Sequence, residues 1–230
     1  ARSGALGETE LIDALDGVEL LGIRSRTHIT ERVLKAHPQL VAVGAFCIGT
    51  NQIDLPAAAS AGVAVFNAPY SNTRSVVELA LGEIITMARR LGDKNANMHA
   101  GIWDKSANGS HEVRGRTLGI IGYGNIGSQL SVLAEGLGMK VYFYDIVDRL
   151  ALGNATRVYS LQELFELCET ITMHVDGRAS NAHMIGEKEF SQMRPRTLFL
   201  NLCRGNVVDV DALAAALKSG HIAGTAVDVF

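Results

Sequence analysis

The sequence predicts an α/β protein built from two doubly wound parallel sheets. Short apolar runs rich in β-branched residues alternate along the chain with segments of helical spacing. A glycine-rich loop, Gly122 to Gly127, follows one such run and leads into a helical pattern. Strands alternating with helices favour parallel sheets, whose ligands lie beyond the carboxyl ends of the strands.

The first part of the chain, residues 1–71, is expected to form a small sheet of its own. Its elements are apolar runs bounded by turn residues, with helical spacing between them. Strands are predicted at residues 18–23, 40–44 and 63–66, and helices at 31–36 and 55–61. Turn formers at 67–72 mark the joint to a second domain, which we place at residues 72–230.

The second domain opens with a long apolar helix, predicted from Thr73 to about Arg90. A further helix runs from about Asp211 to Gly220, where glycine suits a left-handed C-cap. Strands are predicted at residues 117–121, 140–144, 170–175, 197–201 and 224–229.

The glycine loop has the spacing of a dinucleotide-binding turn. Gly122 permits the tight turn, Gly124 leaves room for a pyrophosphate, and Gly127 lets the helix pack close to the sheet. Phosphates would lie on the helix N-terminus. Asp145, at the end of the next apolar run, would accept hydrogen bonds from ribose hydroxyls and repel a ribose phosphate, which favours NAD over NADP. The alternative is a solvated acid at a strand end.

Composition narrows the class of protein. The net charge is −3 and no long basic run occurs, so we expect no nucleic-acid partner. The sequence has neither a run of about 20 apolar residues nor a signal peptide, so we expect a cytoplasmic protein with no membrane association. Cys47, Cys168 and Cys203 are widely separated, as reduced thiols are, and no metal site is predicted.

Polar residues also follow the first two predicted strands. Arg24, Ser25 and Arg26 end the first, and guanidinium groups bind carboxylate or phosphate in bidentate fashion. Backbone N–H groups around Gly49, after the second strand, form a candidate anion nest. Exposed arginines in a surface loop are the alternative reading.

These motifs together resemble the phosphoglycerate dehydrogenase branch of the D-2-hydroxyacid dehydrogenase family. The resemblance covers nearly the whole chain. It is carried by residues 24–28, 49–51, 66–69, 71–76, 119–124, 142–145 and 227–230. It implies a partial flavodoxin-like substrate domain, a Rossmann NAD-binding domain, and NAD-dependent oxidation of 3-phospho-D-glycerate in serine biosynthesis by a homodimer or homotetramer.

The resemblance also implies roles for individual residues. Arg204 is the catalytic arginine that orients the substrate and polarises its keto oxygen. Cofactor contacts fall to residues of the second domain: Gly122, Gly124, Asn125, Ile126, Gly127, Asp145, His174, Leu202, Cys203 and Asp228. Substrate contacts fall to Arg24, Ser25, Arg26, Ile48, Gly49 and Asn72.

The chain departs from the family pattern in several places. The Glu and His of the family's proton-transfer pair have no counterpart here, and the opening βα unit is also missing, so we expect a fragment. Asp176 stands where the family has Pro, which suggests a displaced or flexible loop. His221 is interpreted as structural and Cys203 as a buried small hydrophobe. Trp103 is either a subunit contact or a partly buried core aromatic.

Two other functions stay open. One is oxidation of a different 2-hydroxy acid that lacks a phosphate. The other is a non-enzymatic NAD-sensing scaffold on the same fold, which would have no need of the paired arginines Arg24 and Arg26.

Overall fold

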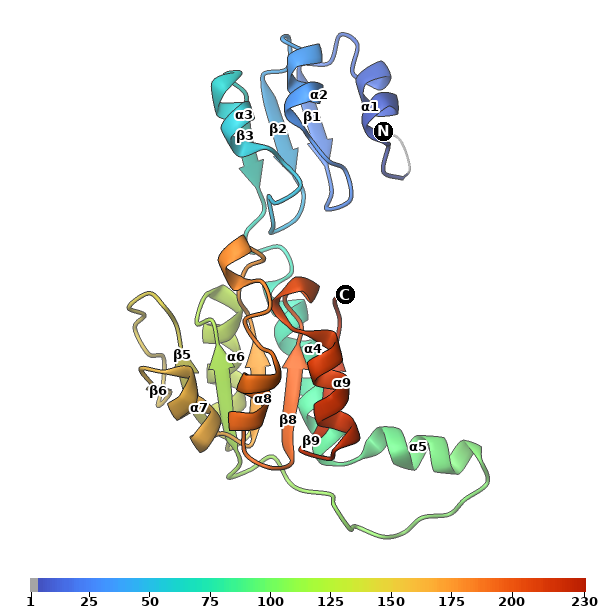
Figure 1. Ribbon diagram of the computed structural model, residues 1–230, viewed down its shortest axis with the longest axis vertical. Coiled ribbons are helices and arrows are strands. Elements are labelled where there is room, and N and C mark those ends of the chain that lie inside the picture. Colours follow the sequence, from blue (N-terminus) through green and yellow to red (C-terminus); the bar gives the residue numbers. More distant parts are fainter. Residues whose placement is uncertain (1–3) are drawn as a thin grey trace. The chain divides into compact units, whose positions relative to one another are not determined.

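The computed structural model describes residues 4–230, which divide at Thr73 into two compact units (Figure 1). Each unit contains a sheet whose strands are all parallel. The strand order is β1-β2-β3 in the first unit and β6-β5-β4-β7-β8-β9 in the second. The predicted α/β class with parallel sheets is therefore confirmed.

The first unit alternates helix and strand, and α2, α3 and its three strands lie within two residues of their predicted bounds. Its elements are α1 (Glu8–Ala14), β1 (Leu20–Ile23), α2 (Glu31–Ala36), β2 (Ala42–Ala45), α3 (Leu55–Ser60) and β3 (Ala64–Asn67). Two side chains cap helices by accepting backbone hydrogen bonds: Thr30 from Val33 N at the start of α2, and Asp54 from Ala57 N at the start of α3.

The two faces of this first sheet differ. Helices α1, α2 and α3 pack their apolar side chains against one face, where Ile23, Val43 and Ala45 are buried. On the other face Leu20 and Phe66 are exposed by 73% and 65%. Among the described residues of this unit the sheet therefore buries only one of its apolar faces.

The second unit is larger and has helices on both faces of its sheet. Its elements are α4 (Thr73–Ala88), α5 (Leu91–His99), β4 (Thr117–Ile121), α6 (Asn125–Gly136), β5 (Lys140–Tyr144), β6 (Thr156–Arg157), α7 (Leu161–Leu167), β7 (Thr170–Met173), α8 (Glu187–Gln192), β8 (Thr197–Asn201), α9 (Val210–Lys218) and β9 (Ile222–Val227). Two short 3-10 turns lie at Ala179–Asn181 and Gly205–Val207.

Two apolar cores hold this unit together. Helices α4 and α6 cover one face of the sheet, with Ile84 and Leu130 fully buried against the strands. Helices α7, α8 and α9 cover the other face, with Phe165 and Phe199 among the fully buried side chains. This arrangement on both faces, visible in Figure 1, is the doubly wound architecture that the sequence predicted.

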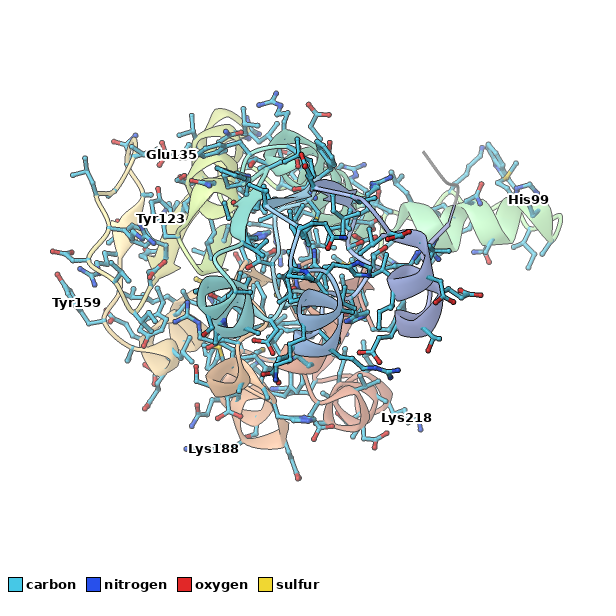
Figure 2. All side chains as sticks on the ribbon, turned by 90° about the horizontal axis from the view of Figure 1, so that it is seen from above. His99, Tyr123, Glu135, Tyr159, Lys188 and Lys218 are labelled. Carbon is cyan, nitrogen blue, oxygen red and sulfur yellow. The ribbon has the colours of Figure 1, made fainter. Side chains whose placement is uncertain are left out.

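A few elements differ from the prediction. Helix α4 ends at Ala88 rather than near Arg90, because Arg90 adopts a left-handed conformation (φ 55°) and starts a new helix, α5. Helix α5 has no buried residue, so it lacks the apolar stripe that marks a helix in a sequence. It projects from the unit, with His99 at its far end (Figures 1 and 2). Strand β9 lies two residues earlier than predicted.

Trp103 follows α5 and is 70% exposed. The interpretation of Trp103 as a partly buried core aromatic is therefore wrong, while its role at a subunit contact stays a prediction. No helix within residues 4–230 is both long and apolar enough to cross a membrane.

The one-sided packing of the first sheet predicts a difference in local stability. In the 230-residue chain, backbone amides of β1, β2 and β3 should exchange with solvent at least tenfold faster than those of β4, β7 and β8, since they have fewer apolar contacts to break on local opening. Hydrogen exchange followed by NMR or mass spectrometry measures this. Equal protection of the two sheets would contradict it.

Candidate functional site

The glycine loop joins β4 to α6 with no space for side chains at two of its glycines. Gly122 has φ +92°, a conformation that favours glycine, and a Cβ there would lie 2.6 Å from the carbonyl oxygen of His174. A Cβ on Gly127 would lie 2.3 Å from the carbonyl oxygen of Gly122. The first turn of α6 therefore packs against the end of β4 at a distance that only glycine allows.

Gly124 is different, because a Cβ there would meet nothing within 4 Å. It is the N-cap of α6, and no side chain caps this helix. The first N–H groups of a helix have no partner within the helix, so those of Asn125 and Ile126 are free to bind an anion in the open space beside Gly124. The residues present fit a pyrophosphate.

The carboxylate of Asp145, which follows β5, faces this loop. One oxygen accepts a hydrogen bond of 2.8 Å from the N–H of Tyr123, and the other accepts one of 2.8 Å from the N–H of Val147. The guanidinium of Arg149 lies 3.7 Å away, and the Asp145 side chain is only 10% exposed. Asp145 is thus an anchored acid at the strand end, which contradicts a freely solvated one.

Tyr123 anchors the segment that follows Asp145. Its ring is buried and stacks on Phe143, with 3.7 Å between the ring centroids. Its hydroxyl lies 2.6 Å from Ser131 Oγ in helix α6 and accepts a hydrogen bond of 3.2 Å from the N–H of Leu152. One residue therefore fixes both ends of the loop from Asp145 to Leu152.

His174 follows β7, and its N–H donates to the carbonyl of Ile121 at 2.7 Å. Its Nε2 lies 3.0 Å from Thr172 Oγ1, whereas its Nδ1 is buried without a partner among the described residues. Burial lowers the pKa of His174 to about 4, so the imidazole is neutral near pH 7.

Asp176 organises the loop that comes next. Its carboxylate binds the guanidinium of Arg178 and accepts from Asn181 Nδ2 at 3.1 Å. The hydrogen bond from the Arg178 side chain, with smaller contributions from the Arg178 backbone N–H and the charges of Arg178 and Arg204, lowers the pKa of Asp176. Asp176, which stands where the family has Pro, thus holds this loop through hydrogen bonds of its own side chain.

The catalytic candidate Arg204 lies on the loop after β8. Buried Asn201 ties this loop together: its Nδ2 donates to the Arg204 carbonyl at 3.0 Å, and its Oδ1 accepts from the N–H of Cys203 at 3.3 Å. The Arg204 stem lies against Gly177, where an added Cβ would be 3.1 Å from it. The half-buried guanidinium donates to the Cys203 carbonyl at 2.6 Å.

The remaining predicted cofactor contacts, Leu202, Cys203 and Asp228, also follow the ends of strands. Leu202 and Cys203 are buried, and burial raises the pKa of the Cys203 thiol, so this cysteine is the small unreactive hydrophobe expected. Asp228 is exposed, and its N–H donates to the Asn201 carbonyl at 3.2 Å. The candidates of the second unit therefore all lie along the carboxyl edge of one sheet.

The first unit gathers its own candidates at the corresponding edge of its sheet. Arg24, Ser25 and Arg26 follow β1 and are exposed. Ile48 and Gly49 follow β2, where Asn67 Nδ2 donates to the Ile48 carbonyl at 2.7 Å. Asn72 is also exposed, at the end of this unit immediately before α4.

Two residues that organise the second unit's edge were not found from the sequence. Tyr123 lies inside the glycine motif at a position that the motif leaves free. Asn201 ends an apolar run, and a polar side chain at the end of a buried strand is a signal that could have indicated it. His221 accords with its structural interpretation, since its Nε2 contacts the Met193 carbonyl at 3.0 Å.

The arrangement defines the second unit as a dinucleotide-binding α/β domain. Residues 81–230 match the family model for the NAD binding domain of D-isomer specific 2-hydroxyacid dehydrogenases. The chain belongs to this family, and the NAD binding predicted from the glycine loop is confirmed with it.

Curated relatives match almost the full chain. D-3-phosphoglycerate dehydrogenase of Haemophilus influenzae is 54% identical over 226 residues, which are 98% of this chain and 55% of the relative. The enzyme of the same name from Escherichia coli K12 is 53% identical over 227 residues, with 99% and 55% coverage. The chain therefore spans about half the length of these relatives.

Solved structures show the same fold. D-lactate dehydrogenase of Aquifex aeolicus, determined with NAD and lactic acid, has a TM-score of 0.86 and 30% identity over 98% of this chain and 67% of its own. A D-2-hydroxyisocaproate dehydrogenase has a TM-score of 0.88 and 28% identity over 100% of this chain and 70% of its own.

Replacing Tyr123 by Phe tests whether the Tyr123 hydroxyl stabilises the carboxyl edge of the second unit's sheet, where the candidate cofactor contacts lie. Tyr123→Phe keeps the stacked ring but removes the hydrogen-bond partner of the Leu152 N–H and one of the two partners of Ser131 Oγ, which keeps the Ser128 carbonyl. The second unit should therefore lose about 1–2 kcal/mol of unfolding free energy. Urea unfolding measures this loss, and the Leu152 amide should exchange faster.

Tyr159→Phe is the matched control, because Tyr159 is 80% exposed and lies at the periphery in Figure 2. It should change the unfolding free energy by less than about 0.5 kcal/mol. Equal effects of the two substitutions would show that the Tyr123 hydroxyl does not hold the loop.

Proposed function

We propose that these residues belong to an enzyme that oxidises 3-phospho-D-glycerate to 3-phosphohydroxypyruvate with NAD, a step of serine biosynthesis. The observation that carries this proposal is the identity of more than half of the residues with the H. influenzae and E. coli phosphoglycerate dehydrogenases across nearly the whole chain. D-3-phosphoglycerate dehydrogenase 2 of Saccharomyces cerevisiae is still 50% identical over 226 residues.

The substrate class is supported by the charges of the first unit. 3-Phosphoglycerate carries a carboxylate and a phosphate, both of which guanidinium groups bind well. Arg24 and Arg26 are exposed at the carboxyl end of β1 and have no carboxylate partner among the described residues. We assign Arg24, Ser25, Arg26, the backbone at Ile48 and Gly49, and Asn72 to binding the substrate anions.

The chemistry is the loss of a hydride from C2 and a proton from its hydroxyl. NAD, when bound, supplies the acceptor for the hydride. We assign to Arg204 the stabilisation of negative charge on the substrate oxygen, because its backbone is fixed by Asn201 and its stem by Gly177. The family resemblance gives the proton transfer to a Glu and a His that follow the segment Val227–Phe230 in the family.

We also infer assembly and location from the family. A homodimer or homotetramer agrees with the exposed Trp103 after α5, a residue that resembles a subunit contact. The cysteines of residues 4–230 are free, and two of them are buried, which suits the reducing cytoplasm.

A substrate panel tests the function against its rivals. The full-length protein should reduce NAD with 3-phosphoglycerate at a kcat/KM at least a hundredfold above those with glycerate or lactate. Preference for an unphosphorylated acid would favour a different dehydrogenase of this family. Binding of NAD without turnover of any acid would favour the sensing scaffold.

Cofactor preference follows from Asp145. NAD should bind at least about tenfold more tightly than NADP, because the buried carboxylate repels a ribose phosphate, and each 1.4 kcal/mol corresponds to a factor of ten. Calorimetric titration of both cofactors measures the ratio. Asp145→Ala should narrow it, mainly by improving NADP, whereas Asp148→Ala, which removes an exposed carboxylate three residues away, should leave it unchanged.

Substitution of the arginines should separate chemistry from binding. In the full-length enzyme, Arg204→Ala should lower kcat by roughly a hundredfold or more, as loss of a transition-state contact does. Arg24→Ala and Arg26→Ala should chiefly raise KM for the phosphorylated substrate. The control is Arg114→Ala, because Arg114 is exposed and lies away from the carboxyl edges of both sheets. If Arg204 and Arg24 variants gave the same kinetic pattern, these assignments would be wrong.

A further inference from the structure

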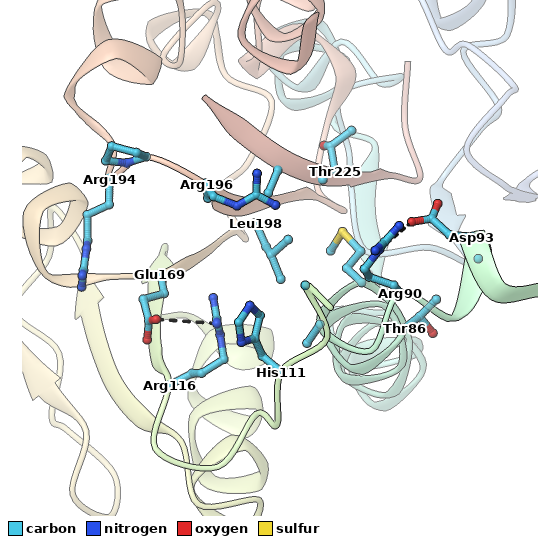
Figure 3. Close-up of a pocket in the computed structure, with 17 residues that line it drawn as sticks. Thr86, Arg90, Asp93, His111, Arg116, Glu169, Arg194, Arg196, Leu198 and Thr225 are labelled. Carbon is cyan, nitrogen blue, oxygen red and sulfur yellow. Dashed lines mark hydrogen bonds and ion pairs between the residues drawn. The ribbon is translucent and has the colours of Figure 1, made fainter. Parts of the chain in front are cut away.

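A second cationic site lies at the opposite edge of the NAD-binding sheet. A cavity of about 400 Å³ opens where four strands begin, lined by residues that include Arg116 before β4, Glu169 before β7, Arg196 before β8 and Ala223 in β9 (Figure 3). Strand β4 has five residues, so at about 3.3 Å per residue the cavity is about 17 Å from the glycine loop.

The cavity carries an excess of positive charge. Four arginines are among its lining residues, Arg90, Arg116, Arg194 and Arg196, together with the acids Asp93 and Glu169. The Arg194 guanidinium also donates to the carbonyl of Leu167 at 3.5 Å. Arg90 pairs with Asp93 at 2.9 Å, and Arg116 lies 3.6 Å from Glu169 (Figure 3). Arg194 and Arg196 have no carboxylate partner among the described residues, which leaves a net charge of +2.

Arg116 contributes an unused donor. Its side chain is 16% exposed, and its Nε is buried with no hydrogen-bond partner among residues 4–230. Glu169 is also held elsewhere, because one of its oxygens accepts from the N–H of Thr117 at 3.2 Å. Because the guanidinium of Arg116 is mostly buried and only loosely paired with Glu169, its positive charge at the cavity wall would stabilise a bound anion.

The backbone conformation of Arg196 also supports an anion site in this cavity. Residues 194–197 form a turn in which the N–H of Thr197 donates to the Arg194 carbonyl at 3.2 Å. Pro195 is second in this turn, and Arg196 is third with φ +67°, a position that glycine or asparagine ordinarily takes. Residues held in unfavourable backbone conformations cluster at binding sites, which makes Arg196 a candidate contact for a ligand.

We propose that this cavity binds a small doubly charged oxyanion, a phosphate group either free or on a metabolite, between Arg116, Arg194 and Arg196. The net charge of +2 matches the charge of a phosphate, and guanidinium groups offer it bidentate hydrogen bonds. The site lies at the opposite edge of the sheet from the glycine loop and contains no residue of the first unit, and it is independent of the function proposed above.

Calorimetric titration with inorganic phosphate tests this site. The protein carries Arg24→Ala and Arg26→Ala and is saturated with NAD, so that the other two anion-binding places are removed or filled. Chloride keeps the ionic strength constant. Phosphate should bind, Arg194→Gln and Arg196→Gly should each weaken it at least fivefold, and Arg114→Gln should leave its affinity within twofold.

Arg196→Gly also separates binding from folding. Glycine suits the positive φ, so without phosphate the melting temperature of this variant should equal or exceed that of its parent, while the stabilisation by phosphate is lost. If Arg196→Gly alters the turn, the phosphate affinity of Arg194→Gln decides whether the cavity binds the anion. The proposal is overturned if phosphate does not bind the parent, if both cavity variants keep its affinity, or if Arg114→Gln weakens it as much as they do.

Discussion

The carboxyl edge of the second unit's sheet, where the candidate cofactor contacts lie, depends on the close approach of α6 to the end of β4. With 2.3 Å between the Gly122 carbonyl oxygen and any Cβ on Gly127, a side chain at that position would push the helix away from the sheet. The same approach puts the first N–H groups of α6 beside the open space at Gly124. Neighbouring strands then supply Asp145, His174 and Arg204 to that edge, because parallel strands all end there.

Two of these strand-end loops, those after β5 and β8, are fixed by a buried polar group rather than by apolar packing alone. The hydroxyl of Tyr123 holds the loop after β5, and the amide of Asn201 holds the loop after β8. Buried polar groups with satisfied hydrogen bonds fix one geometry, whereas apolar contacts tolerate small shifts. A site that holds a cofactor in a fixed position benefits from this kind of support.

The sequence predicted elements best where the hydrophobic pattern and the flanking turn residues marked the same boundaries. The strand from Thr117 to Ile121 was predicted with its exact bounds, since an apolar run precedes the glycine loop. Helix α5 was missed because its contacts are with solvent, so no apolar stripe records it. Site residues could be predicted where a motif fixes their spacing, as for Gly122 and Asp145. Tyr123 and the cavity at Arg116 were not, because their partners are distant in sequence and meet only through the parallel sheet.

Arginine at the third position of the turn before β8 has an evolutionary consequence. A single change of Arg196 to glycine or asparagine would relax the backbone and stabilise the fold, so random substitution offers an easy route away from arginine. Chains under selection only for stability would drift toward those residues. Aligned sequences of this family can therefore test the proposed site: retention of a basic residue at this position would mark lineages in which the cavity has been kept for a ligand.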